Sequence, residues 1–147
     1  NKSEKKIYYS DITFIGHYEN DYRSEYINYL FKKGFDIKIW SGKSWGSKLC
    51  SQYYEKKGEI IPAFGDLYNK ILSESKICLV FLSKLNRDTY TRRCFEITAS
   101  RGLMLAERTS DLQTIFKEDV HACYFSSLIE LEEKIKWLLK NPKSAKK

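Results

Sequence analysis

The chain has 147 residues, enough for one domain with a sizeable hydrophobic core. Its 42% hydrophobic and 15% aromatic residues exclude a disordered chain, and no apolar run approaches the roughly 18 residues that cross a bilayer. The net charge of +7 lies mostly at the ends: residues 1–6 carry +2 and residues 140–147 carry +4, so the nearly neutral body argues against a nucleic-acid-binding face.

The first residues, NKSEKK, do not form a signal peptide, because no apolar segment of suitable length follows them. No methionine opens the chain, so we expect a piece of a longer protein, with an ordered core at about 7–141 and basic termini at 1–6 and 142–147. Widely spaced cysteines without a C-x-x-C pair predict reduced thiols rather than a metal site: Cys50, Cys78, Cys94 and Cys123. These features favour a cytoplasmic protein.

Strand-like and helical periodicities then alternate along the chain. Strands are predicted at 7–16, 35–40, 76–82, 103–107 and 121–125. Helices are predicted at 21–34, 65–75, 91–100, 110–118 and 127–141, the last with Ser126 or Ser127 as N-cap and Glu130 completing a capping box. Residues 41–58 are expected to be a long connection that includes a helical turn, and residues 59–64 a short extended piece that Pro62 confines to an edge or a strand end.

This alternation predicts a single α/β domain, a Rossmann-like three-layer sandwich with a mostly parallel sheet. The continuous apolar run KICLVFL at 76–82 is typical of a parallel strand buried on both faces. We expect the core to include Ile15, Ile37, Leu79, Phe81, Leu103 and Leu105.

Ligands of open parallel sheets bind beyond the carboxyl ends of the strands, and Gly16 and His17 follow the first predicted strand. A glycine there lets the backbone approach a phosphate, and Arg23 follows in the next helix. The G-x-G-x-x-G pattern of dinucleotide sites is absent, so Gly16 is either an ordinary turn glycine or part of a phosphate-binding loop.

The helix at 91–100 carries Arg93 and Glu96, three residues apart and therefore on one face near its N-terminus. Phe95 and Ala99 are expected on the core-facing stripe, with Cys94 at its margin. Arg93 and Glu96 are either a surface ion pair of small energy or a ligand site. In a ligand site, a guanidinium suits phosphate oxygens and a carboxylate accepts hydrogen bonds from a vicinal diol such as ribose.

The stretch NRDTYTRRCFEITASRGLMLAER, residues 86–108, resembles the characteristic segment of the spore-maturation CgeB-like group of GT-B glycosyltransferases. The resemblance to the C-terminal half of these enzymes extends from Asp11 to Pro142. It includes the segments FIGHYENDYRSEYINYL, SESKICLVF and SSLIELEEKIKWLL. In such proteins this half binds the nucleotide-sugar donor, and the acceptor-binding half precedes it.

The resemblance implies a donor-binding set of Gly16, His17, Arg23, Phe64, Asp88, Tyr90, Arg93 and Glu96. In it, Glu96 would hold the ribose hydroxyls, Arg93 would face the diphosphate, and the segment 62–65 would hold the base. Related retaining enzymes carry an E-x7-E pair, whereas this chain has the shorter Asp88 at the upstream position. Arginines and a helix dipole would neutralise the phosphates, so no metal or other cofactor is expected.

Two alternatives come from other functional classes. The outline of residues 11–40 also fits TIR-like or receiver-like signalling domains, which would use the same edge of the sheet for partner docking or NAD cleavage. That outline does not account for Arg93 and Glu96. The other alternative, a nucleic-acid-binding module with basic tails, is weakened by the charge distribution.

Overall fold

The computed structural model describes residues 10–42, 44–83, 92–100, 102–118 and 122–141. In this part of the chain five parallel strands form one sheet in the order β2-β1-β3-β4-β5. The strands are β1 (Ile12–Ile15), β2 (Ile37–Trp40), β3 (Ile77–Val80), β4 (Met104–Glu107) and β5 (Cys123–Phe125). The predicted parallel sheet is therefore confirmed.

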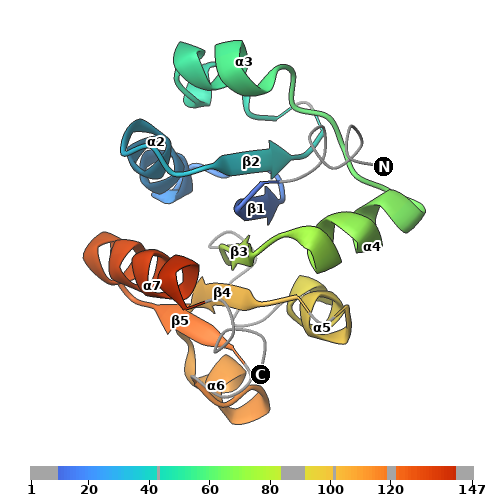
Figure 1. The fold of residues 1–147 in the computed structure, drawn as a ribbon, viewed down its shortest axis with the longest axis vertical. Helices are drawn as coiled ribbons and strands as arrows, with labels where there is room; N and C mark the ends of the chain where they lie inside the picture. Colours follow the sequence, from blue (N-terminus) through green and yellow to red (C-terminus); the bar gives the residue numbers. More distant parts are fainter. Residues whose placement is uncertain (1–9, 43, 84–91, 101, 119–121, 142–147) are drawn as a thin grey trace.

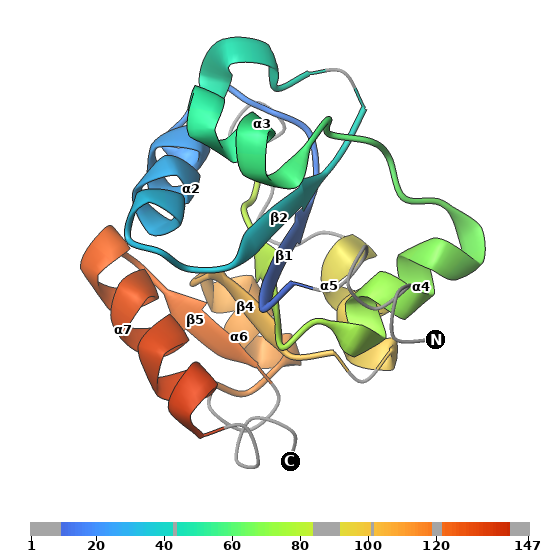
Figure 2. The same cartoon turned by 45° about the horizontal axis from the view of Figure 1, so that its top comes forward.

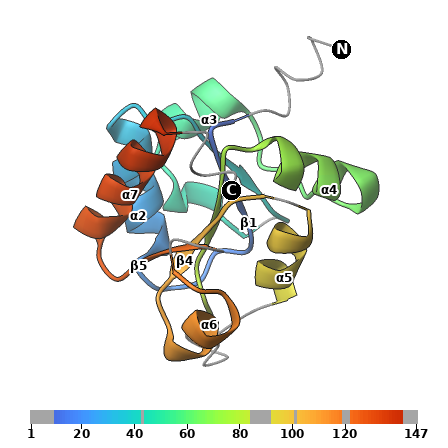
Figure 3. The same ribbon diagram turned by 60° about the horizontal axis from the view of Figure 1, so that its bottom comes forward.

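Helices cover both faces of the sheet (Figures 1 and 3). One face carries α2 (Arg23–Lys32), α3 (Ser51–Lys57) and α7 (Leu128–Lys140); the other carries α4 (Gly65–Glu74), α5 (Arg92–Ala99) and α6 (Ser110–Ile115). Along the sheet, the connection from β1 to β2 runs toward one edge, and the connections from β3 to β4 and β5 run toward the other edge. Because parallel crossovers are right-handed, the helices of these two sets of connections lie on opposite faces. The structure confirms a Rossmann-like three-layer sandwich.

Alternate side chains of the apolar run around β3 enter two hydrophobic clusters. Ile77, Leu79 and Phe81 pack with α2 and α7, whereas Cys78, Val80 and Leu82 pack with α4 and α5. Burial on both faces explains why this strand has no polar alternation. Of the predicted core residues, Ile15, Ile37, Leu79, Phe81 and Leu105 are buried, and Leu103 is partly buried against the same core.

The connection between β2 and α4 is more helical than predicted. It contains a short 3-10 helix (Gly46–Lys48) and α3, which lies beside α2 before the chain passes over the β2 side of the sheet to α4 (Figure 2). Tyr53 is the one buried residue of α3, so the helix needs no apolar repeat and its sequence shows none. The hydroxyl oxygen of Tyr53 accepts the N–H of Ile39 at 2.8 Å and so ties α3 to β2.

Two helix boundaries bear on the predicted elements. Ser127 caps α7 by accepting the N–H of Glu130 at 3.1 Å, which confirms Ser127 as the N-cap. The Glu130 side chain accepts the N–H of Ser126 at 2.7 Å, one residue before the N-cap, so the reciprocal bond of the predicted capping box is shifted by one residue. Helix α6 ends at Ile115, earlier than predicted, because Phe116 leaves the helical conformation.

Candidate functional site

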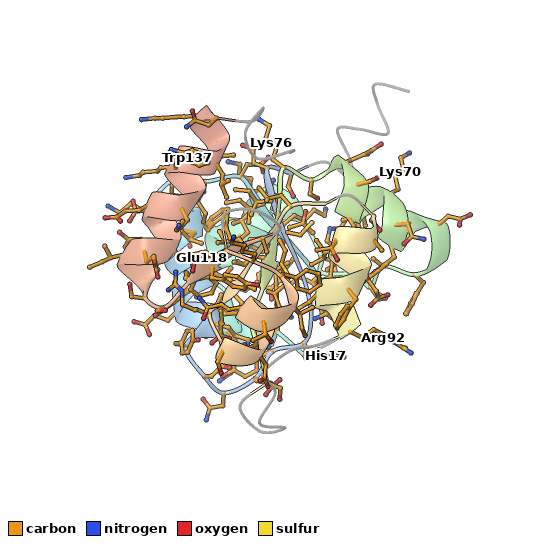
Figure 4. All side chains as sticks on the ribbon, turned by 90° about the horizontal axis from the view of Figure 1, so that it is seen from below. His17, Lys70, Lys76, Arg92, Glu118 and Trp137 are labelled. Atoms are coloured by element: carbon orange, nitrogen blue, oxygen red, sulfur yellow. The ribbon has the colours of Figure 1, made fainter. Side chains whose placement is uncertain are left out.

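The strand order reverses between β1 and β3, so the segments that follow these strands diverge at the carboxyl edge of the sheet. Open α/β sheets bind ligands at such a switch point. His17, after β1, and Arg92, at the start of α5, lie at this end of the molecule, whereas Lys76 and Trp137 lie at the opposite end (Figure 4). The carboxyl ends of β1 and β3 are therefore the place where a ligand is expected.

Gly16 and Arg93 come into close approach at this switch point. A Cβ atom added to Gly16 would lie 2.7 Å from Cζ of Phe14 and 3.3 Å from Nη1 of Arg93. The first distance is shorter than real Cβ contacts, so only glycine fits at this position without a shift of the buried Phe14 ring. The fold thus brings the end of β1 and the first turn of α5 together, and the contact with Phe14 by itself accounts for a glycine at this position.

The backbone of Gly16 is held on both sides. Its N–H donates to the carbonyl of Trp40 at 3.0 Å, and its carbonyl accepts the indole N–H of the buried Trp45 at 3.0 Å. The Trp45 ring also contacts Phe14 and Tyr18 edge-on. The loop after β1 is therefore fixed by packing before any ligand is present.

Arg93 is half-buried, and its Nε atom is buried without a hydrogen-bond partner among the described residues. Buried polar atoms are normally paired, so a buried N–H of a cation without a partner is an unusual feature. A guanidinium near a helix N-terminus attracts an anion, because the free N–H groups and the helix dipole act in the same direction. This position of Arg93 is chemically suited to a phosphate group.

Glu96 lies one turn beyond Arg93 on α5 and contacts a residue that the sequence did not single out. The hydroxyl of Tyr68, on α4, donates to Oε1 of Glu96 at 3.2 Å. Burial, followed by the charge of Glu96, raises the pKa of Tyr68, whereas the charge of Arg93 lowers it. Arg93, Glu96 and Tyr68 therefore form one polar group that joins α4 and α5.

The buried face of α5 differs from the prediction. Cys94 and Ile97 are almost fully buried, whereas Phe95 is 42% exposed and Ala99 is exposed. Phe95 packs instead against the ring of Phe116 at a centroid distance of 5.4 Å. The predicted stripe of Phe95 and Ala99 was therefore wrong, being rotated by about one residue around the helix, or about 100°.

Arg23 is placed differently from the phosphate contact expected of it. The side chain is 3% exposed and donates to the carbonyls of His17 and Leu82, each at 3.0 Å, and to the carboxylate of Asp21 at 3.0 Å. Its guanidinium also lies over the ring of Phe81. Arg23 thus ties the loop after β1 to the end of β3, and each of its three guanidinium nitrogens donates to a partner within the protein.

His17 and Phe64 are both exposed. The Nδ1 atom of His17 lies 3.5 Å from Oγ of Ser41, and its ring borders the carboxyl edge. Phe64 is 76% exposed and occupies the N-cap position of α4, one turn before Tyr68. Its neighbour Gly65 has φ +59°, a conformation that favours glycine. The remaining predicted residues, Asp88 and Tyr90, lie outside the described residues.

The sequence pattern of a family described as glycosyl transferase-like matches residues 23–147, well over half of the chain. The chain belongs to this family. No curated protein matches the chain significantly. Membership in the glycosyl transferase-like family associates the chain with glycosyl transfer and implies a sugar donor. The match includes Tyr68, Arg93 and Glu96, and it begins after Gly16 and His17.

This glycosyl transferase-like chain also carries a buried acid that sequence reasoning missed. Glu107, at the carboxyl end of β4, is 6% exposed and accepts the N–H of Leu82 at 2.5 Å and the hydroxyl hydrogen of Tyr22. Burial raises the pKa of Glu107 to about 7. The signal in the sequence was an acidic residue directly after the apolar segment LMLA, at the end of a predicted strand. Glu107 links β4, the end of β3 and the start of α2 beneath the candidate site.

A surface network lies beside it at the end of β4. Arg108 donates to Glu118 at 2.6 Å and to Glu130 at 2.8 Å, and these hydrogen bonds hold the pKa of both carboxyls below the usual range.

The described residues of the glycosyl transferase-like chain contain no cluster of three or more acidic, histidine or cysteine side chains suited to a metal ion. In the same part of the chain, no helix combines the length and apolar character that crossing a membrane requires.

Proposed function

We propose that this chain is the donor-binding domain of a GT-B glycosyltransferase and binds a nucleoside diphosphate sugar at the carboxyl edge of β1 and β3. Arg93 faces the diphosphate beside the loop that begins at Gly16, whose own N–H and carbonyl are bonded within the protein. Glu96 accepts hydrogen bonds from the ribose hydroxyls. The observation that carries the proposal is the contact-range approach of Arg93 to Gly16, with Glu96 one turn further on the same helix. Membership in the glycosyl transferase-like family supports it.

The base is assigned to the side of α4. Phe64 is exposed at the start of this helix, and Ile61, 45% exposed, precedes it. An exposed aromatic ring one turn before Tyr68 offers a stacking surface next to the residue that contacts Glu96. A ligand with its ribose at Glu96 would therefore extend its diphosphate toward Arg93 and its base toward Phe64.

Catalysis in such a site comes from stabilising the departing diphosphate and from orienting donor against acceptor. Arg93 and the N-terminus of α5 supply positive charge where the leaving group gains negative charge, so the proposal assigns no role to a metal ion. The acceptor would be held by a separate domain that precedes this one in the full-length protein, as in the CgeB-like group.

A signalling function is the second candidate, because the strand order 2-1-3-4-5 is also that of flavodoxin-like domains. Strand order alone does not determine function. The polar group of Arg93, Glu96 and Tyr68 and the family membership favour donor binding over this candidate.

One titration series separates these candidates. The chain is titrated calorimetrically with uridine and guanosine diphosphates, with NAD and with a short oligonucleotide, with and without Mg²⁺. If the chain binds a donor, at least one nucleoside diphosphate should bind saturably and increase the melting temperature. Its affinity should be equal within about twofold in the presence of Mg²⁺ or of a chelator. Binding of NAD or the oligonucleotide alone would contradict the proposal.

A further inference from the structure

The contact between Tyr68 and Glu96 joins two helices that both begin at or near the candidate site. Tyr68 is in the first turns of α4, where its N–H lies 3.4 Å from the carbonyl of Phe64. Glu96 is on α5, and the 3.2 Å bond from the Tyr68 hydroxyl reaches its Oε1 atom. Both side chains are partly buried, so the contact forms in a region with restricted access to water.

The direction of this hydrogen bond follows from the chemistry of the two groups. An ionised carboxylate can only accept, so the phenol must donate. Burial and the charge of Glu96 raise the pKa of Tyr68, which keeps its hydroxyl protonated throughout the neutral range. Tyr68 is therefore a constant donor to Glu96.

A fixed donor on one oxygen limits the rotation of the carboxylate. Two carboxylate oxygens offer about four acceptor positions, and Tyr68 occupies one of them. A free glutamate loses side-chain entropy when it binds a ligand, whereas a glutamate that is already oriented loses less. Bonding to a vicinal diol needs both hydroxyls within reach of one oriented carboxylate, so orientation affects selectivity as well as affinity.

We propose that Tyr68 is a positioning residue that orients Glu96 for the two hydroxyls of a ribose and so makes the site select ribonucleotides over 2′-deoxyribonucleotides. This inference rests on the proposed function, because it needs a nucleotide at Glu96. Tyr68 need not touch the ligand. A purely structural role, in which the bond only joins α4 to α5, would affect stability without affecting selectivity.

The test compares Tyr68→Phe with a matched variant on the other face of the sheet. The hydroxyl of Tyr29, on α2, donates to Oε1 of Glu132 at 2.6 Å, so Tyr29→Phe removes the same type of bond away from the site. Affinities of uridine and guanosine diphosphates and of their 2′-deoxy counterparts are measured by calorimetry for the wild type and for both variants. The same measurements are made for Glu96→Gln and for the double variant that combines Glu96→Gln with Tyr68→Phe. Melting temperatures are recorded in parallel.

We expect the wild type to prefer the ribonucleotide, and Tyr68→Phe to bind it about three- to tenfold more weakly while binding the 2′-deoxy form within about twofold of the wild type. Tyr29→Phe should leave both affinities unchanged. In Glu96→Gln, adding Tyr68→Phe should have little further effect. An unchanged ribo-to-deoxyribo ratio in Tyr68→Phe, with selectivity lost in Glu96→Gln, would overturn this inference and leave the proposed function standing. A wild type that binds neither diphosphate would overturn both.

Discussion

Gly16 and Arg93 approach so closely that an added Cβ atom at Gly16 would lie 3.3 Å from Nη1 of Arg93. The same atom would lie 2.7 Å from the buried Phe14 ring, which packs against Trp45 and Phe81. The backbone at Gly16 and the guanidinium of Arg93, which are distant in the sequence, are therefore close together in the folded chain. Their proximity depends on the absence of a side chain at Gly16.

Gly16→Ala should therefore lower the free energy of unfolding by about 1–3 kcal/mol, because the Phe14 ring must move to admit the methyl group. Gly42→Ala is the matched control: nothing lies within 4 Å of its added Cβ atom, and its φ is not in the region that favours glycine. The control should be neutral or stabilising by up to about 1 kcal/mol. Equal denaturant midpoints for both variants would contradict the crowding at Gly16.

Arg23→Met should destabilise the chain by about 3–5 kcal/mol, because it removes the cation beside the Asp21 carboxylate and the guanidinium donors to the carbonyls of His17 and Leu82. Lys32→Met, which changes an exposed basic residue on the same helix, should alter stability by less than about 0.5 kcal/mol. Chemical denaturation of both variants measures the difference. A loss below about 1 kcal/mol for Arg23→Met would show that Arg23 does not hold the two loops together.

Glu107 should make stability depend on pH between its ordinary pKa near 4.5 and its raised pKa of about 7. The folded state binds this proton more tightly than the unfolded state, so the stabilisation is complete below pH 4.5 and is lost as the pH rises through 7. In Glu107→Gln, the free energy of unfolding should fall by about 1–2 kcal/mol less than in the wild type as the pH rises from about 5 to 8.

The amide introduced by Glu107→Gln can accept the N–H of Leu82 and donate to the hydroxyl oxygen of Tyr22, so the variant should remain folded. Glu133→Gln, at an exposed position on α7, serves as the control and should keep the wild-type profile. Parallel pH profiles for Glu107→Gln and the wild type would contradict the raised pKa of Glu107.

On the proposed assignment to the donor-binding half of a GT-B enzyme, the isolated chain should bind a nucleoside diphosphate sugar but transfer no sugar, because the acceptor side of the cleft would belong to another domain. Product formation from a radiolabelled donor is measured for this chain and for the full-length protein. Transfer to a defined acceptor by the isolated chain would contradict the assignment to a donor-binding half.

The sheet could be predicted because apolar runs and turn residues are local signals. The run at 76–82 indicated a strand buried on both faces, and β3 occupies the sheet centre. The buried face of α5 was not predictable from hydrophobicity alone, since Phe95 is the more apolar residue but Cys94 is buried. Helix α3 was predicted only as a helical turn, because Tyr53 is its one buried residue and Tyr54 is partly buried against the core.

Arg93 and Glu96 could be proposed as site residues because their spacing places both at one helix terminus. Their partners could not, because Tyr68 comes from a separate helix and meets Glu96 only in the folded chain. Glu107 was missed for the same reason: Leu82 and Tyr22, which surround it, are distant in sequence. Arg23 was expected at the ligand because it follows the loop after the first strand. Its burial could not be predicted, because it depends on contacts with the carbonyls of Leu82 and His17 that form only in the folded chain.

Arg93→Lys tests whether Arg93 binds the diphosphate, with Arg92→Lys as the control from the adjacent, exposed position. Calorimetry is performed with a nucleoside and its diphosphate at low and high salt. Arg93→Lys should lose about tenfold or more in diphosphate affinity, since lysine lacks the planar fork that bridges two oxygens. Arg92→Lys should lose less than about twofold, and nucleoside binding should be unchanged in both variants. Equal, small losses for the two variants that disappear at high salt would instead show a diffuse positive field and would contradict diphosphate binding by Arg93.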